Sequence, residues 1–141
     1  STIANGGLQV RPRRVASFTE DGESVYGNLP ISGGERILDE AVAGQVASFL
    51  AGVVAEGTGA SAQPAHYHAA GKTGSAQTGQ MAAGPDGQEE IIHAWFAGFY
   101  PVEHPQYAIV VLGEGLESGG DYAAPVFREI ADRLYDLGLV G

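Results

Sequence analysis

The 141-residue chain contains no cysteine, which excludes a disulfide framework and a thiolate metal site. Positive charge is also scarce, with one lysine and six arginines against 17 acidic residues and a net charge of -10. Because phosphate binding requires a basic face, nucleic acid is not expected as a partner. No stretch approaches the roughly 20 apolar residues that a membrane-spanning helix needs.

What remains is a composition typical of one folded domain. The length allows a single hydrophobic core but not two. Hydrophobic residues make up 44% of the chain and charged residues 17%, which argues against disorder.

The first thirty residues predict a helix end and then a β-hairpin. Asn5, Gly6 and Gly7 are typical of a helix that ends in a left-handed conformation, which would place residue 1 inside an element. A flexible tail is the alternative. Two β-rich runs, Val15–Thr19 and Ser24–Tyr26, flank an Asp-Gly pair, which indicates a hairpin.

A helix is expected from an N-cap at Asp39 to about Ala55, with Gly57-Thr58-Gly59 ending it. Ser32-Gly-Gly-Glu35 also matches a capping box. Two glycines make a poor first turn, however, so Asp39 is preferred. Apolar residues at helical spacing predict one buried face, formed by Val42, Val46, Phe49, Leu50 and Val53.

The second half predicts three strands, roughly His66–Gln77, Ile91–Tyr100 and Tyr107–Leu112. The connections Thr78–Glu90 and Pro101–Gln106 are short enough for antiparallel neighbours. With the helices on either side, the pattern predicts an α+β fold in which helices pack on an antiparallel sheet.

A final helix follows Gly119-Gly120-Asp121, with Asp121 as the expected N-cap and Pro125 in the first turn. Gly138 should end it. The expected buried stripe consists of Ala124, Phe127, Ile130, Ala131, Leu134 and Leu137.

The only lysine, Lys72, lies in the segment Gly71-Lys72-Thr73-Gly74-Ser75. A cation, two hydroxyls and two glycines within five residues favour a site for an anionic group. This segment has three competing interpretations. The first is a phosphate-binding P-loop, but that motif needs a glycine where the chain has His66 and a helix after the threonine, which is not expected here. The second is a strand that merely exposes a lysine. The third is a serine acyl-transfer site, in which Lys-Thr-Gly lies on a strand that lines the cleft.

The residues around Lys72 favour the third interpretation, because they resemble class B penicillin-binding proteins of the serine D,D-transpeptidase and β-lactamase-like superfamily. The resemblance covers nearly the whole chain, in order. Ala69–Gln77 resembles the family's Lys-Thr-Gly strand, and His93–Pro101 resembles the strand that follows it. Three further segments resemble the last strand and the C-terminal helix: Tyr107–Val111, Gly119–Gly120 and Ala123–Val126. Two segments upstream also match, Ile3–Gly7 and Val53–Gly59.

This resemblance implies a D,D-transpeptidase that cross-links peptidoglycan stem peptides outside the cytoplasmic membrane, in a parent protein anchored to that membrane. Its ligands would be stem peptides ending in D-Ala-D-Ala and β-lactams, and no cofactor or metal is implied. A serine is acylated by the penultimate D-Ala, the terminal D-Ala leaves, and an amine of a second strand resolves the acyl-enzyme.

The resemblance also implies roles for four residues. Lys72 would supply positive potential and a proton-relay contact to the catalytic hydroxyls. Thr73 and Ser75 would bind the terminal carboxylate, and Gly74 would let substrate lie against the strand edge. The backbone N–H of Ser75 would form half of the oxyanion hole, where aligned donors stabilise developing charge. Many members have threonine where this chain has Ser75, a change that keeps the hydroxyl.

The family's nucleophile motif, Ser-x-x-Lys, is absent, because Ala69 stands three residues before the only lysine. No Ser-x-Asn occurs either. Tyr26-Gly27-Asn28 mimics a Tyr-x-Asn variant, but it lies downstream of Ile3–Gly7 rather than upstream, so a turn is preferred. Without an activated nucleophile there is no covalent catalysis.

Residues 1–141 are therefore expected to be the C-terminal segment of an incomplete transpeptidase domain, inactive alone, with about three of its five sheet strands. The Tyr107–Leu112 strand would have an open edge, for the missing N-terminal segment or for self-association. The alternative is a non-catalytic binding or regulatory module of the same ancestry.

Other candidate residues favour structural roles. His66 and His68 would point to the same side of a strand, but no third metal ligand is evident, so strand packing or solvent contact is preferred. His93, Trp95 and Phe96 are expected in the core and on the sheet faces. Glu89-Glu90 is expected in a solvated loop.

Overall fold

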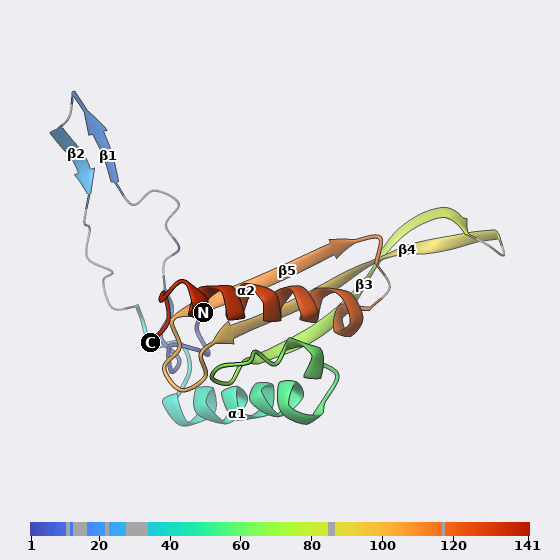
Figure 1. Ribbon diagram of the computed structural model, residues 1–141, viewed down its shortest axis with the longest axis horizontal. Coiled ribbons are helices and arrows are strands. Elements are labelled where there is room, and N and C mark those ends of the chain that lie inside the picture. The colour runs from blue at the N-terminus through green and yellow to red at the C-terminus, as the bar shows by residue number, and fades with distance from the viewer. Residues whose placement is uncertain (11, 13–16, 22, 28–33, 85–86, 117) are drawn as a thin grey trace.

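The computed structural model describes residues 1–141 except 11, 13–16, 22, 28–33, 85–86 and 117 (Figure 1). Residues Val15, Ala16, Asn28 and Ser32 of the predictions above lie outside the described part. The elements are β1 (Ser17–Glu20), β2 (Glu23–Gly27), α1 (Glu40–Glu56), the 3-10 helix η1 (Ala60–Ala62), β3 (Ala70–Gly84), β4 (Gly87–Tyr100), β5 (Tyr107–Glu114), the π-helix η2 (Gly119–Ala123) and α2 (Ala124–Asp136).

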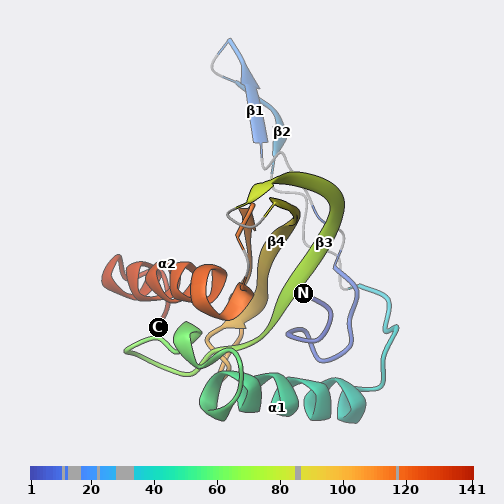
Figure 2. The same cartoon turned by 90° about the vertical axis from the view of Figure 1, so that its right-hand side faces the viewer.

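The main sheet has the order β3-β4-β5, with both pairs antiparallel. α2 runs along the sheet, and α1 lies beside β3 at the end of the sheet where β3 begins (Figures 1 and 2). β1 and β2 form a separate antiparallel hairpin, as predicted. The α+β prediction is therefore confirmed. Among the described strands, β5 is an edge strand, so its outer backbone groups have no described partner strand.

The core lies between the sheet and α2. Phe96 and Tyr100 of β4 and Phe127 of α2 are fully buried. The rings of Phe96 and Phe127 lie 4.7 Å apart between centroids, a favourable aromatic distance. These contacts hold α2 against the middle strand of the sheet.

The predicted stripe of α2 is too wide. Phe127 and its alanine neighbours on the stripe are buried, but Ile130 and Leu137 are 38% and 56% exposed. These two residues lie on an adjoining side of the helix, because the buried contact runs at i, i+3 and i+7 from Ala124. Alanines in that contact let the helix approach the sheet along a narrow line.

The predicted face of α1 is confirmed in part, because Val46, Leu50 and Val53 are half-buried. Ala43 and Val54 are the buried residues of the helix, whereas Val42 and Phe49 are 47% and 67% exposed. Periodicity alone did not separate the two adjoining stripes, because both carry apolar residues. The predicted cap is confirmed, since Asp39 Oδ1 accepts a 2.9 Å hydrogen bond from the backbone N–H of Ala41.

The segment Thr78–Glu90 was wrongly predicted to be a connection. β3 and β4 continue through it as a two-stranded arm that closes at Gly84 and Gly87, with a bulge between Gln77 and Met81. The arm extends beyond the end of β5 (Figure 1). Its strands lack clear alternation of apolar residues, because a two-stranded arm has no core to bury.

Glu90 lies in this arm rather than in a solvated loop. Its carboxylate accepts 2.8 Å hydrogen bonds from Gln77 Nε2 and from the backbone N–H of Gly79. Glu90 therefore ties both sides of the bulge to β4.

One predicted left-handed helix end is confirmed, since Gly138 has φ +66° and follows the end of α2. Near the N-terminus Gly6 also has a left-handed φ of +61°, and the backbone N–H of Gly7 donates to the Thr2 carbonyl at 3.0 Å. Residues 2–7 form turns, however, and no described helix ends there. Asp121 is not the cap of the final helix. It lies within η2, which leads into α2, and Ser118 caps η2 because its side chain accepts from the Asp121 N–H.

No helix among the described residues is long and apolar enough to cross a membrane.

Candidate functional site

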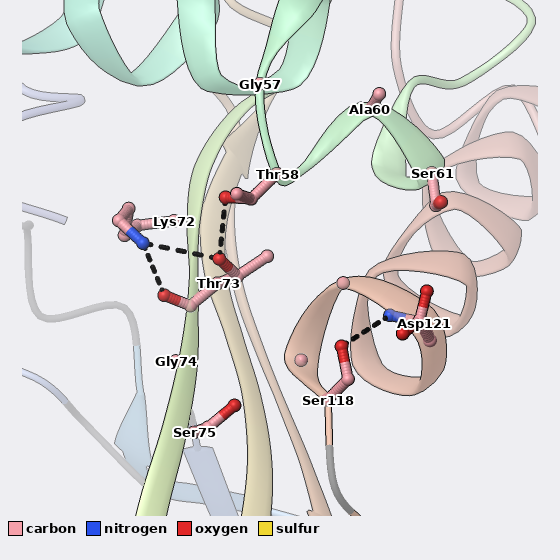
Figure 3. A pocket seen from close by; sticks show the side chains of 12 residues that line it. Gly57, Thr58, Ala60, Ser61, Lys72, Thr73, Gly74, Ser75, Ser118 and Asp121 are labelled. Carbon is pink, nitrogen blue, oxygen red and sulfur yellow. Dashed lines mark hydrogen bonds between the residues drawn. The ribbon is translucent and has the colours of Figure 1, made fainter.

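A pocket of about 500 Å³ lies where three segments meet (Figure 3). The first is the turn after α1, the second is the beginning of β3, and the third leads into α2. All four residues predicted for the site line this pocket. The lining residues are Gly57, Thr58, Ala60, Ser61, Lys72, Thr73, Gly74, Ser75, Ser118, Gly119, Gly120 and Asp121.

A short hydrogen-bond network joins Lys72 to two hydroxyls. Lys72 Nζ lies 2.8 Å from the Thr73 carbonyl oxygen and 3.3 Å from Thr73 Oγ1. Thr73 Oγ1 lies 2.9 Å from Thr58 Oγ1. Because an ammonium only donates, Thr73 Oγ1 accepts from Lys72 and keeps its own proton available to Thr58 or to a ligand.

Strand geometry determines how these side chains are distributed. Successive residues of a strand point to opposite sides, so Thr73 and Ser75 share one side of β3. In Figure 3 both side chains extend toward the pocket, while Lys72 leaves the strand on the other side and its Nζ returns to Thr73. A cation and adjacent hydroxyls arranged in this way can stabilise an anionic group.

Two glycines let the third segment approach the other two. A Cβ at Gly119 would overlap the Trp95 carbonyl oxygen and would lie 2.7 Å from the carbonyl oxygen of Gly74. A Cβ at Gly120 would lie 2.7 Å from the Thr58 carbonyl oxygen. Only glycine fits at these positions, because the opposing atoms are backbone and cannot rotate away.

Sequence reasoning missed four polar residues of the pocket: Thr58, Ser61, Ser118 and Asp121. Thr58 stands between two glycines, and Ser118 and Asp121 flank the Gly119–Gly120 pair. Hydroxyl and acidic residues beside glycines were the available signal. From the sequence, Thr58 is interpreted only as part of a helix end and Asp121 only as a helix N-cap.

The two candidate histidines lie outside the pocket, in the segment before β3 rather than on a strand, which corrects the prediction. The His66 ring stacks on Tyr135 with centroids 3.8 Å apart. His68 Nδ1 contacts the carboxylate of Glu103. The described residues contain no group of three or more histidine, cysteine or acidic residues that could hold a metal ion.

The other three candidates are part of the sheet, as expected. Phe96 is buried in the core, and Trp95 is half-buried on the opposite face of β4. His93 is half-buried, and its Nδ1 accepts from the backbone N–H of Gly115 at 3.3 Å.

Hydrogen bonds from β4 and the residues after it hold the segment that leads into β3. Tyr100 Oη donates to the His66 carbonyl at 2.8 Å, and burial, followed by nearby negative charges, raises the pKa of this phenol. Glu103 accepts from the backbone N–H of His68 at 3.1 Å. Desolvation raises the pKa of the Glu103 carboxyl, but hydrogen bonds with the His68 side chain and with backbone N–H groups outweigh it, so the pKa lies below its ordinary value.

Comparisons with known proteins show the family of this chain. Residues 1–132 match the family described as the penicillin binding protein transpeptidase domain. The chain is 33% identical to penicillin-binding protein PbpB of Mycolicibacterium smegmatis, over 94% of this chain and 22% of that protein. It is 30% identical to the peptidoglycan D,D-transpeptidase PbpA of Mycobacterium tuberculosis, over 94% of this chain and 27% of that protein.

The fold is similar to solved transpeptidase domains. The D,D-transpeptidase domain of a peptidoglycan glycosyltransferase from Eggerthella lenta superposes with a TM-score of 0.78 at 28% identity, over 99% of this chain and 31% of that one. The chain thus spans about a quarter of the length of the curated relatives. It belongs to the penicillin-binding protein transpeptidase domain family.

Proposed function

We propose that this chain supplies the wall of a peptidoglycan D,D-transpeptidase active site that holds the substrate carboxylate. The observation that carries the proposal is the pocket in which the Lys72 ammonium and the hydroxyls of Thr58 and Thr73 form one hydrogen-bonded network. The parent protein would act outside the cytoplasmic membrane, to which it would be anchored.

The ligands are stem peptides ending in D-Ala-D-Ala and β-lactams, which both present a carboxylate beside a reactive carbonyl. Thr73 and Ser75 bind the carboxylate, and Lys72 supplies the balancing charge. The backbone N–H of Ser75 donates to the oxyanion that forms when the carbonyl is attacked. Gly74 between them leaves room for the substrate against the strand edge. Donors fixed in place before the reaction stabilise this charge without reorganisation.

The acylated serine comes from another segment, because this chain has no Ser-x-x-Lys. Residues 1–141 are then the C-terminal segment of a transpeptidase domain. β5 is the element that would receive the remainder of the domain. It is an edge of the described sheet, and its residues Val110 and Leu112 are 62% and 42% exposed. Edge strands with exposed apolar residues favour pairing with further chain.

A fluorescent penicillin tests the proposal by covalent labelling. We expect no labelling of residues 1–141 alone and labelling when the chain is joined to the preceding segment of its parent, which would carry Ser-x-x-Lys. Lys72→Gln should reduce labelling of the joined protein by about a hundredfold, since removing one such transition-state contact typically costs that much.

Arg128→Gln is the matched control, because it removes an exposed positive charge on α2, outside the pocket. It should leave labelling unchanged. Labelling of residues 1–141 alone would refute the claim that the nucleophile lies elsewhere. Failure of the joined, folded protein to label would favour a non-catalytic binding or regulatory module instead.

A further inference from the structure

The pocket carries charge of both signs. Lys72 contributes the positive charge from β3, and Asp121 contributes the negative charge from η2. In Figure 3 the two residues lie on opposite sides of Thr73. A cleft that served only to hold a carboxylate would gain nothing from a second carboxylate on its wall, because like charges repel.

The backbone of Asp121 is held in place from several directions. Its N–H donates to Ser118 Oγ at 3.3 Å. The two preceding residues, Gly119 and Gly120, are pressed against backbone atoms of the other two pocket segments. The backbone position from which the Asp121 side chain extends is therefore fixed in the pocket lining.

The Asp121 carboxylate itself is unpaired in the part of the chain that the structure describes. No described residue donates a hydrogen bond to it or forms an ion pair with it. Lys72, by contrast, already donates to Thr73. An acidic residue in the first turn of a helix stabilises that helix, which accounts for the residue type. Helix stabilisation does not, however, explain why the Asp121 carboxylate lines a pocket.

Resting on the proposed function above, we infer that Asp121 is a specificity-determining residue that binds a cationic group of the ligand. The ligand carboxylate lies against Lys72, Thr73 and Ser75, and an ammonium group of the same ligand lies against Asp121. A pocket of about 500 Å³ has the size of a small-molecule site, so both groups can belong to one ligand. The preferred ligand is therefore a zwitterionic peptide or β-lactam.

Two penicillins that differ by one amino group test this inference. Ampicillin carries an ammonium group, and benzylpenicillin lacks it. Each would compete with fluorescent penicillin for the joined protein, in the wild type and in Asp121→Asn. The ratio of their half-blocking concentrations is compared between the two proteins, so any difference in intrinsic reactivity cancels.

We expect Asp121→Asn to reduce the preference for ampicillin about threefold, the size of an exposed ion pair. Asp121→Glu keeps the charge and should retain the preference. Asp136→Asn, at the far end of α2, is the matched control and should not alter the ratio. The preference should also weaken as salt is raised, because salt screens exposed charges.

An unchanged ratio in Asp121→Asn would overturn the inference while leaving the proposed function standing, since both penicillins would still block labelling. If neither penicillin blocked labelling of the wild type, the proposed function would fail and the inference would fail with it. Circular dichroism of each variant establishes that its fold is intact.

Discussion

Replacing Gly119 by alanine should destabilise the protein strongly, although it adds only one methyl group. The added Cβ would overlap the Trp95 carbonyl oxygen and would lie 2.7 Å and 3.0 Å from the backbone oxygen and nitrogen of Gly74. All three atoms are backbone, so relief requires η2 to move away from both β3 and β4. Overpacking of a buried site typically costs 1–3 kcal/mol, and we expect about 3 kcal/mol here.

The same substitution at Gly44 is the matched control. Gly44 lies in the exposed part of α1, and no atom lies within 4 Å of a Cβ built there. Alanine should therefore stabilise the helix by about 0.5–1 kcal/mol, through its higher propensity and a less flexible unfolded chain. The same glycine-to-alanine substitution should thus lower the free energy of unfolding at position 119 and raise it at position 44.

Thermal and urea unfolding followed by circular dichroism measure both effects. For a protein of this size, 1 kcal/mol corresponds to roughly 2–4 °C in the unfolding midpoint, so Gly119→Ala should lower it by about 10 °C. Equal stability of Gly119→Ala and wild type would refute the close approach of η2 to β3. It would also refute the explanation that the pocket forms because glycine at this position lets the three segments approach one another.

Three further perturbations test individual contacts. In a double-mutant cycle, Thr58→Val and Thr73→Val should show a coupling energy of about 0.5–1 kcal/mol by urea unfolding, and strict additivity would contradict their hydrogen bond. Glu90→Ala should speed amide exchange at Gly79 roughly tenfold, with little change in global stability, because the arm lies outside the core; unchanged exchange would contradict the hydrogen bond from the Gly79 N–H to the Glu90 carboxylate. The pKa of Glu103 lies below its ordinary value of 4.5, so its ionised form stabilises the fold above that pH, and this contribution is lost as the pH falls through the lower folded value. Glu103→Gln should therefore flatten the acid limb of a stability–pH curve, whereas an unaltered limb would count against the contact.

Local features of the fold could be predicted from the sequence. Asp39 and Gly57 bound α1, and Gly138 ends α2, because caps depend on hydrogen bonds and dihedral angles within a few residues. The helix faces could not be assigned in the same way. Val42 and Phe49 belong to one apolar stripe of α1 and Ala43 and Val54 to the next, and the choice depends on how the helix meets β3.

The β3–β4 arm was missed for a related reason. Periodicity reports burial against a core, and residues 78–90 have little core to contact. Their pairing depends on strand partners that meet across the hairpin and on the side chain of Glu90. Neither can be recognised from alternation of apolar residues.

The segment around Lys72 shows what the sequence determined about the site by itself. One lysine, two hydroxyls and two glycines in five residues, with their flanks, indicated an anion site and resembled a transpeptidase strand. Tertiary structure alone decided what surrounds that strand. It brings Thr58, 15 residues earlier, within 2.9 Å of Thr73, and it places Asp121 in the lining of the same pocket. Such contacts arise where Gly119 and Gly120 allow backbones to approach, and spacing along the chain does not encode that distance.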